Sequence, residues 1–364
     1  MPIRHIKISG VRNLQPLDIE VNPYVNFIYG ANGSGKTSLL EAIALMATGR
    51  SFRTHHFKYV MQHDADRIEM LFDLEDANLG NGQLDSLRLK TGDYLLKFNG
   101  SVLTAQSDAA LRLPVQIIDP TTFKLLSGSP EERRQLIDWG VFHVEHEFIN
   151  EWKVFKQQLK QRNSILKQNE KEWLPIWNQG FIESALKIDS RRKKYLEQFK
   201  WFFNDALNKL APEISIEMSY YPGWDRDSDL AEILAKQEER DFVLGYTQAG
   251  PHRAELRFKI DKQPAVEILS RGQQKAVVAA LKIAQGGLFQ ELTKRQTIYL
   301  VDDLASELDE KHRLALCKLL ESLKCQVFIT SIDKEKLTDL WQPVSSRLFH
   351  VEQGKLIEES SQIA

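Results

Sequence analysis

The N-terminal part of the chain alternates between apolar and polar residues, the pattern of strands that bury one face. The repeat is clearest at Ile6, Ile8, Leu17, Ile19 and Val21. Further short strands are predicted over residues 68–74, 87–90, 94–98 and 115–118. An amphipathic helix interrupts this series, ends near Ala47 and has Gly49 as its C-cap. The pattern therefore predicts a β-rich segment around one helix.

After Pro130 the spacing of apolar residues changes from that of strands to that of helices. Residues 131–210 are predicted to be helical, with a break at Trp173-Leu174-Pro175. Aromatic residues recur at helical spacing in this stretch, which favours core packing over stacking on bases. Pro212 ends the helical stretch, and a strand is predicted over 214–220.

The C-terminal part alternates between strand and helix patterns. The predicted elements cover 255–260, 271–292, 297–301, 309–323 and 326–330, followed by a hairpin over 346–351 and 355–358. We therefore expect one α/β unit built from residues 1–130 and 246–364, with a mainly helical lobe inserted at 131–245.

The composition allows a globular protein of two lobes, with 364 residues of which 42% are hydrophobic. No apolar stretch approaches the roughly 20 residues of a membrane helix. The first ten residues lack the apolar core of a signal peptide. Cys317 and Cys325 are expected to be buried thiols. These features predict a cytoplasmic protein without a membrane partner.

Charge is distributed unevenly along the chain, although the net value is only −2. Residues 151–210 carry 13 Lys or Arg against 7 Asp or Glu, an excess of +6 that leaves −8 for the remainder. The densest cluster is Arg191-Arg192-Lys193-Lys194. Such a run fits phosphate contacts with DNA, and it equally fits a solvated helix face, so charge alone leaves both open.

One eight-residue loop carries the strongest chemical signal, because it matches the phosphate-binding pattern G-x-x-x-x-G-K-T between a strand and a helix. Its residues are Gly30, Ala31, Asn32, Gly33, Ser34, Gly35, Lys36 and Thr37. The glycines let successive N–H groups point at a phosphate chain, and the following helix adds its positive dipole end. Lys36 is expected to reach the outer phosphates and Thr37 to hold Mg²⁺. We predict that the chain binds ATP with Mg²⁺.

Two carboxylates follow the apolar strand Ile298-Tyr299-Leu300-Val301. Asp302, at the strand tip, is predicted to hold Mg²⁺, and Asp303 to polarise the attacking water. A strand that ends in Asp-Asp is weak evidence alone, but together with the phosphate-binding loop it indicates the second half of an ATPase site.

A third motif precedes the helix that leads to this strand. Ser270 is a plausible N-cap with Gln273 in the capping-box position, which explains a helix start without any ligand. A helix N-terminus with a hydroxyl and Gly272 also suits a γ-phosphate.

The order Ser-x-Gly-Gln and then Asp-Asp resembles the signature motif and Walker B strand of ABC-type ATPases. This resemblance implies that Ser306-Glu307-Leu308-Asp309 is the D-loop, that Thr330 is the switch residue, and that Gln116 is the Q-loop glutamine, acting in catalysis and at the metal. Transporters and SMC proteins usually carry Glu where this chain has Asp303. A shorter carboxylate predicts slow hydrolysis.

Several stretches, in order along nearly the whole chain, resemble the bacterial RecF family of recombination proteins. They include Gly10-Val11-Arg12-Asn13-Leu14, Gly49-Arg50-Ser51-Phe52-Arg53, residues 128–140, Gln161-Arg162-Asn163, Gly250-Pro251-His252-Arg253 and residues 301–309. The resemblance implies an SMC-like ATPase head and adds Arg12 and Asn13 to the expected nucleotide ligands.

The resemblance also implies an ATP-dependent homodimer in which Ser270, Gly272 and Gln273 of one subunit close on ATP held by the other. Members of the family bind single-stranded, gapped or duplex DNA, work with RecO and RecR in loading RecA, and are linked to replication and the SOS response.

Other ATPase classes are alternatives: a transporter ATPase subunit, another SMC-like chromosome protein, or a metabolic P-loop kinase. The helical insertion argues against the transporter, the 230 or so residues between the loop and Ser270 are too few for long SMC arms, and a kinase has no need of the Ser270–Gln273 signature.

Overall fold

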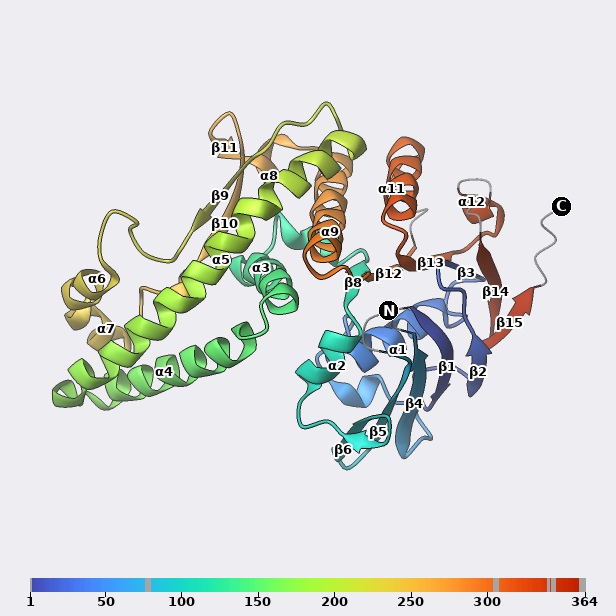
Figure 1. Cartoon of the computed structure of the whole chain (residues 1–364), viewed down its shortest axis with the longest axis horizontal. Helices are drawn as coiled ribbons and strands as arrows, with labels where there is room; N and C mark the ends of the chain where they lie inside the picture. Colours follow the sequence, from blue (N-terminus) through green and yellow to red (C-terminus); the bar gives the residue numbers. More distant parts are fainter. Residues whose placement is uncertain (1, 76–79, 304–307, 339–340, 342–344, 360–364) are drawn as a thin grey trace. The chain divides into compact units, whose positions relative to one another are not determined.

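A computed structural model describes residues 2–75, 80–303, 308–338, 341 and 345–359. The chain forms two compact units (Figure 1). The first contains residues 1–123, 206–212 and 271–364, and the second contains 124–205 and 213–270. The chain therefore leaves the first unit and returns to it, as the sequence predicts.

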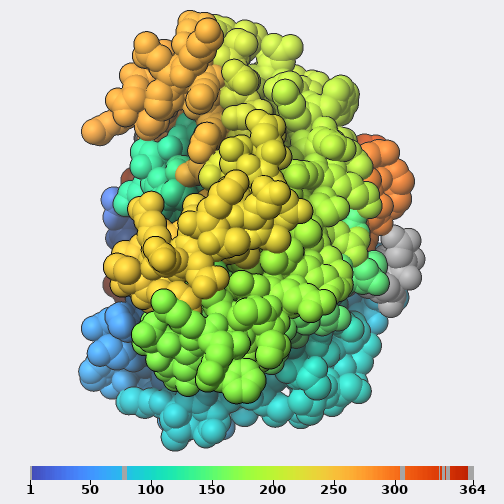
Figure 2. All heavy atoms as spheres, turned by 90° about the vertical axis from the view of Figure 1, so that its left-hand side faces the viewer, coloured from blue at the N-terminus to red at the C-terminus, as the bar shows by residue number. Residues whose placement is uncertain are grey.

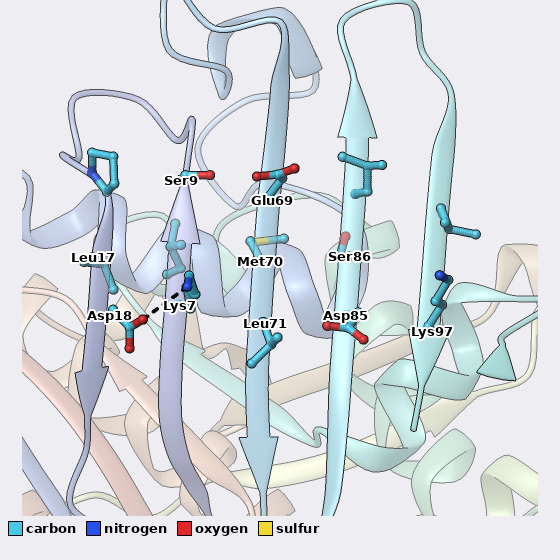
Figure 3. Close-up of a pocket in the computed structure, with 14 residues that line it drawn as sticks. Lys7, Ser9, Leu17, Asp18, Glu69, Met70, Leu71, Asp85, Ser86 and Lys97 are labelled. Atoms are coloured by element: carbon cyan, nitrogen blue, oxygen red, sulfur yellow. Dashed lines mark ion pairs between the residues drawn. The ribbon is translucent and has the colours of Figure 1, made fainter. Parts of the chain in front are cut away.

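The first unit contains an antiparallel sheet in the order β2-β1-β4-β5-β6-β7. Its strands are β1 (Ile3–Ser9), β2 (Leu17–Glu20), β4 (Arg67–Leu74), β5 (Gly82–Leu89), β6 (Tyr94–Phe98) and β7 (Ser101–Val102). Apolar and polar residues alternate, so one face is buried and the other is open. Across the open face runs a groove of about 580 Å³, where Lys7 and Asp18 pair at 3.3 Å beside Leu71, Asp85 and Lys97 (Figure 3).

A second sheet of the same unit has the order β15-β14-β3-β13-β12-β8 and is parallel except for β15. Its strands are β3 (Val25–Tyr29), β8 (Val115–Ile118), β12 (Ile298–Val301), β13 (Gln326–Ser331), β14 (Ser346–Glu352) and β15 (Lys355–Glu359). The central strands are buried along nearly their whole length, as expected for a parallel sheet covered on both faces.

Helix α1 (Lys36–Thr48) joins the inner faces of both sheets in one apolar core. It is buried from Ser38 to Ala47, and apart from Ser38 and Glu41 the residues of this stretch are apolar, as expected for a helix covered on all sides. Further α-helices among the described residues of this unit are α2 (Gln106–Arg112), α9 (Arg271–Thr293), α11 (Glu310–Ser322) and α12 (Glu335–Thr338). This core fixes the start of α1 and the ends of the parallel strands, where the candidate site lies.

The second unit is mainly helical. Its elements are α3 (Pro130–Val144), α4 (Phe148–Gln168), most of α5 (Leu174–Leu210), α6 (Leu230–Lys236), α7 (Glu238–Leu244), α8 (Ala265–Ile268) and a sheet of β11 (Gln263–Pro264), β10 (Glu255–Ile260) and β9 (Glu217–Tyr221). Figure 2 shows the end of α4 beside α6 and α7. The predicted break before Pro175 is confirmed by a 3-10 turn at Lys171–Trp173.

Several predicted boundaries differ from the structure, and residues 206–212, predicted in the inserted lobe, lie in the first unit. Residues 246–270 lie in the second unit rather than the first, because β10 pairs with β9 and packs on α3. The first division falls at 123/124 rather than 130/131. Strand β5 begins at Gly82 instead of residue 87, because its open face carries polar residues that hide the apolar pattern.

Among the described helices, none is long and apolar enough to cross a membrane.

Candidate functional site

The phosphate-binding loop connects β3 to α1 and depends on its glycines. Gly30, Gly33 and Gly35 have φ angles of 151°, 77° and 121°, which other residues rarely adopt. A Cβ atom on Gly30 would lie 2.2 Å from the Val351 carbonyl oxygen. Ala31, Asn32 and Gly33 are exposed at the crest of the loop, whereas Ser34 to Lys36 are buried. The loop therefore has the shape of an open cradle.

Neighbouring segments hold this cradle in place. The Asn13 side-chain amide donates to the Gly33 carbonyl at 2.9 Å and accepts from the Ser38 hydroxyl at 2.9 Å. On the β14–β15 turn, the Gly354 N–H donates to the Ser34 carbonyl at 2.7 Å. Asn13 thus contacts both the loop and the first turn of α1.

The loop also contains polar groups suited to a phosphate chain. Lys36 Nζ donates to the Gly30 and Ala31 carbonyls at 2.7 and 3.0 Å. Burial lowers the pKa of Lys36, and the charges of Asp303 and Asp302 oppose that shift. The buried Ser34 hydroxyl has no hydrogen-bond partner within the described part of the chain. Phosphate oxygens would supply acceptors for both groups, so these residues fit ATP.

Thr37 and Asp302 meet at the end of the parallel sheet. The Thr37 hydroxyl lies 3.0 Å from both carboxylate oxygens of Asp302. Burial raises the pKa of Asp302, and hydrogen bonds from Thr330 and Thr37 oppose this. A divalent cation would favour the charged carboxylate, and a hydroxyl with a carboxylate is a donor set that Mg²⁺ accepts. The predicted metal residues Thr37 and Asp302 therefore lie together.

Thr330 links the two aspartates. Its hydroxyl donates to Asp302 Oδ1 at 2.8 Å and accepts from the Asp303 N–H at 2.8 Å. Asp303 itself has a φ of 51°, so the chain turns sharply after β12. The register of β12 and β13 explains this meeting, because Val301 pairs with Ile329, directly before Thr330.

Gln116 does not join this group. It pairs with Tyr299 in the sheet register, three residues before Asp302, and is buried. Its amide donates to Gln285 at 3.2 Å and accepts from Lys282 at 3.1 Å, both on α9. The resemblance to Q-loops placed it at the metal, but its hydrogen bonds in the structure are to α9.

Two residues near the site were missed by the sequence reasoning. Asp119 directly follows β8, is buried, and its charge adds to the raised pKa of Asp302. Burial lowers the pKa of Lys282 to about 8, and the charge of Asp119 opposes this shift. The signal for Asp119 was present in the sequence, because an acidic residue after a buried parallel strand lies at the same edge as Asp302.

The signature residues lie at the start of α9. Ser270 and Gly272 are exposed, and Gln273 is half-buried. A Cβ atom on Gly272 would meet nothing within 4 Å of the described chain, so internal packing does not require glycine there. Ser306 and Glu307 of the predicted D-loop lie outside the described residues, whereas Asp309 caps α11 by accepting from the His312 N–H at 3.0 Å.

Arg12 makes a two-pronged ion pair with the buried Glu41 of α1, with distances of 2.8 and 2.9 Å. Arg53 approaches the same carboxylate at 3.7 Å. Arg12 and Arg53, which come from two of the motifs that resemble the RecF family, thus share the buried carboxylate of Glu41.

The basic cluster at 191–194 is engaged within the second unit. Arg191 pairs with Glu145, Glu147 and Glu151 at 2.6–2.9 Å. The buried Arg192 pairs with Asp138 at 2.8 Å. The remaining pairs are Lys193 with Asp189 at 2.6 Å and Lys194 with Glu145 at 2.7 Å.

Comparisons with known proteins agree with this geometry. The profile of the RecF/RecN/SMC N-terminal domain matches residues 2–356. The DNA replication and repair protein RecF of Pseudomonas entomophila is 44% identical over 363 residues, with 98% of each chain covered. The corresponding protein of Pseudomonas fluorescens Pf0-1 is 43% identical over the same length and coverage.

Solved structures show the same fold. The recombination mediator protein RecF with ATP, described as part of the RecFOR pathway, superposes with a TM-score of 0.87 at 24% identity, covering 99% of this chain and 98% of that one. An Smc head bound to the C-terminal winged-helix domain of ScpA gives 0.61 at 15% identity, covering 100% and 98%. The fold is therefore that of an SMC-like ABC-type head with a helical insertion.

Proposed function

This chain belongs to the RecF family of DNA replication and repair proteins, and on that premise we propose that it is an ATP-switched DNA-binding protein. In this proposal ATP binding joins two copies into a dimer that clamps single-stranded or gapped DNA. Slow hydrolysis then resets the dimer. The observation that carries the proposal is the meeting of Thr37, Asp302 and Thr330 beside the glycine loop.

Each residue has a proposed role. Residues 30–37 hold the phosphates through backbone N–H groups, Ser34 and Lys36, while Asn13 supports the loop and Arg12 lies beside it. Thr37 and Asp302 hold Mg²⁺. The triphosphate supplies the bond whose cleavage ends the switched state. Asp303, fixed through its N–H to Thr330, orients water. No role at the metal is proposed for Gln116.

The second subunit completes the site in this proposal. Ser270, Gly272 and Gln273 close on the ATP of the partner, which explains a glycine that no packing contact within the described residues requires. The helix N-terminus there directs N–H groups at an anion. We further propose RecO and RecR as partners in loading RecA, and a role in SOS induction, because a structural relative is described as part of the RecFOR pathway.

The experiment compares the dimer mass and nucleotide affinity of three proteins. The wild type should dimerise with Mg-ATP and not with ADP. Lys36→Ala should lose nucleotide binding by about 100-fold, because the buried cation facing the phosphates is gone. Ser270→Arg should bind ATP normally and stay monomeric. A dimer mass that ignores nucleotide would overturn the switch, and a dimeric Ser270→Arg variant would overturn the proposed interface.

A further inference from the structure

Helix α4 presents a row of lysines to solvent. Lys153, Lys156, Lys160 and Lys167 are all exposed, and 3.6 residues per turn place them within an arc of about 60°. The row extends for about 21 Å at 1.5 Å per residue. The end of the helix reaches the surface beside α7 (Figure 2). We call these four residues the α4 lysine row.

None of the four lysines pairs with an acidic side chain in the described part of the structure. Among the described residues, one ring contact involves the row: Lys156 Nζ lies 4.5 Å from the centre of the Trp152 ring. On α5, by contrast, lysines have acidic partners four residues away, as in Glu183–Lys187 at 2.7 Å and Asp189–Lys193 at 2.6 Å. Like charges spaced three or four residues apart destabilise a helix by about 0.2–0.5 kcal/mol per pair. Repulsion among Lys153, Lys156 and Lys160 therefore opposes helix stability, and the Trp152 ring beside Lys156 and the helix C-terminus beside Lys167 offset part of it. A bound anion would relieve the repulsion.

The acidic groups of one groove beside α4 lie on a different side of the helix from the lysine row. A groove of about 460 Å³ between α4 and α5 is lined by Glu147, Glu151 and Glu183, with Val154 and Gln158. Val154 and Gln158 lie more than 90° around the helix from the centre of the lysine row at about 100° per residue. An anion is thus repelled from the groove and attracted to the row.

We propose that the α4 lysine row is a binding site for the phosphate backbone of DNA, an inference that rests on the proposed function. A length of about 21 Å covers about six nucleotides of one strand, at 3.4 Å per nucleotide. Lysine is a point charge that contacts phosphates rather than reading base edges. The row therefore binds DNA without sequence preference and with a strong dependence on salt.

The test measures the affinity for a fluorescent gapped duplex by anisotropy, with Mg-ATP, over a salt series from about 50 to about 200 mM. Each phosphate contact contributes about 0.9 to the slope of log affinity against log salt. Replacing all four lysines by Ala should reduce the slope by up to about 3.6 and weaken binding by 10-fold or more, roughly, at the upper salt concentration. Lys156→Ala with Lys160→Ala should give about half of that change in slope.

The matched control replaces Lys193 and Lys194 by Ala, which removes the same charge as the double variant from the ion-paired cluster, and its slope should stay that of the wild type. Lys156→Arg with Lys160→Arg should also bind like the wild type, because the charge is kept. ATP-dependent dimer mass is measured for every variant and shows whether the variant still folds. If the alanine variants do not fold, the DNA affinity of the arginine variant still tests the lysine row.

The outcomes separate the two claims. A wild type that binds DNA while the quadruple variant keeps its slope would overturn the lysine row and leave the proposed function standing. A wild type that binds no DNA with ATP would overturn both. Loss of binding in the arginine pair would also overturn the row as an electrostatic site.

Discussion

Two groups of basic residues on α4 and α5 of the second unit are used in opposite ways. The cluster at 191–194 is consecutive in sequence, so its side chains point in four directions around α5 and each meets an acid. The α4 lysine row is spread over 15 residues, but its spacing brings the side chains onto one exposed face. Helical spacing and acidic neighbours, rather than the number of basic residues in a short stretch of sequence, therefore determine which cations are available to a ligand.

Arg192 differs most from the α4 lysines, because it is buried and ion-paired, and we expect its replacement to have the largest effect on stability. Its buried guanidinium pairs with Asp138 and donates to the Pro251 carbonyl at 2.7 Å. Arg192→Ala should lower the free energy of unfolding by about 3–5 kcal/mol, because it leaves Asp138 without its partner. Urea denaturation checks this. A loss below about 1 kcal/mol would mean that the cluster is not structural.

Removing the acidic partners of Arg191 would leave it unpaired, like the lysines of the α4 lysine row. Replacing Glu145, Glu147 and Glu151 by Gln removes its three acidic partners. We expect DNA affinity to rise about 2–5-fold at low salt, with an unfolding free energy lower by about 1–2 kcal/mol. Anisotropy and urea denaturation measure the two quantities on the same preparation. Unchanged affinity would show that cations on this side of α5 lie away from DNA even when unpaired.

The smallest expected effects concern single lysines. Lys193→Ala should destabilise the protein by about 0.5 kcal/mol, because it removes an ion pair with Asp189. Lys153→Ala should stabilise it by about 0.2–0.5 kcal/mol at low salt, because repulsion from Lys156 is relieved and no ring contact or ion pair of the described residues is lost. Thermal unfolding at low and high salt compares the two. If both variants changed the unfolding free energy in the same direction, the difference between the paired lysines of α5 and the unpaired lysines of α4 would be contradicted.

Much of the fold and part of the site could be predicted from local patterns. The glycine loop, the strand that ends at Asp302 and the strand before Thr330 each carry their own sequence signal, and parallel strands bring their ends to one edge. The hydrogen bonds of Gln116 to α9 could not be predicted, because they depend on tertiary packing between segments distant in sequence, although the predicted strand 115–118 already places Gln116 near its start rather than at its carboxyl end. The burial of Arg192 was equally hidden, because Asp138 and Pro251 come from distant segments.

In the proposed function, ATP assembles two subunits on DNA. Sedimentation velocity of the wild type on a gapped duplex measures this directly, with Mg-ATP in one cell and Mg-ADP in the other. We expect two subunits per DNA with ATP and loss of that complex with ADP. A single bound subunit in both nucleotides, or a dimer that persists with ADP, would contradict it.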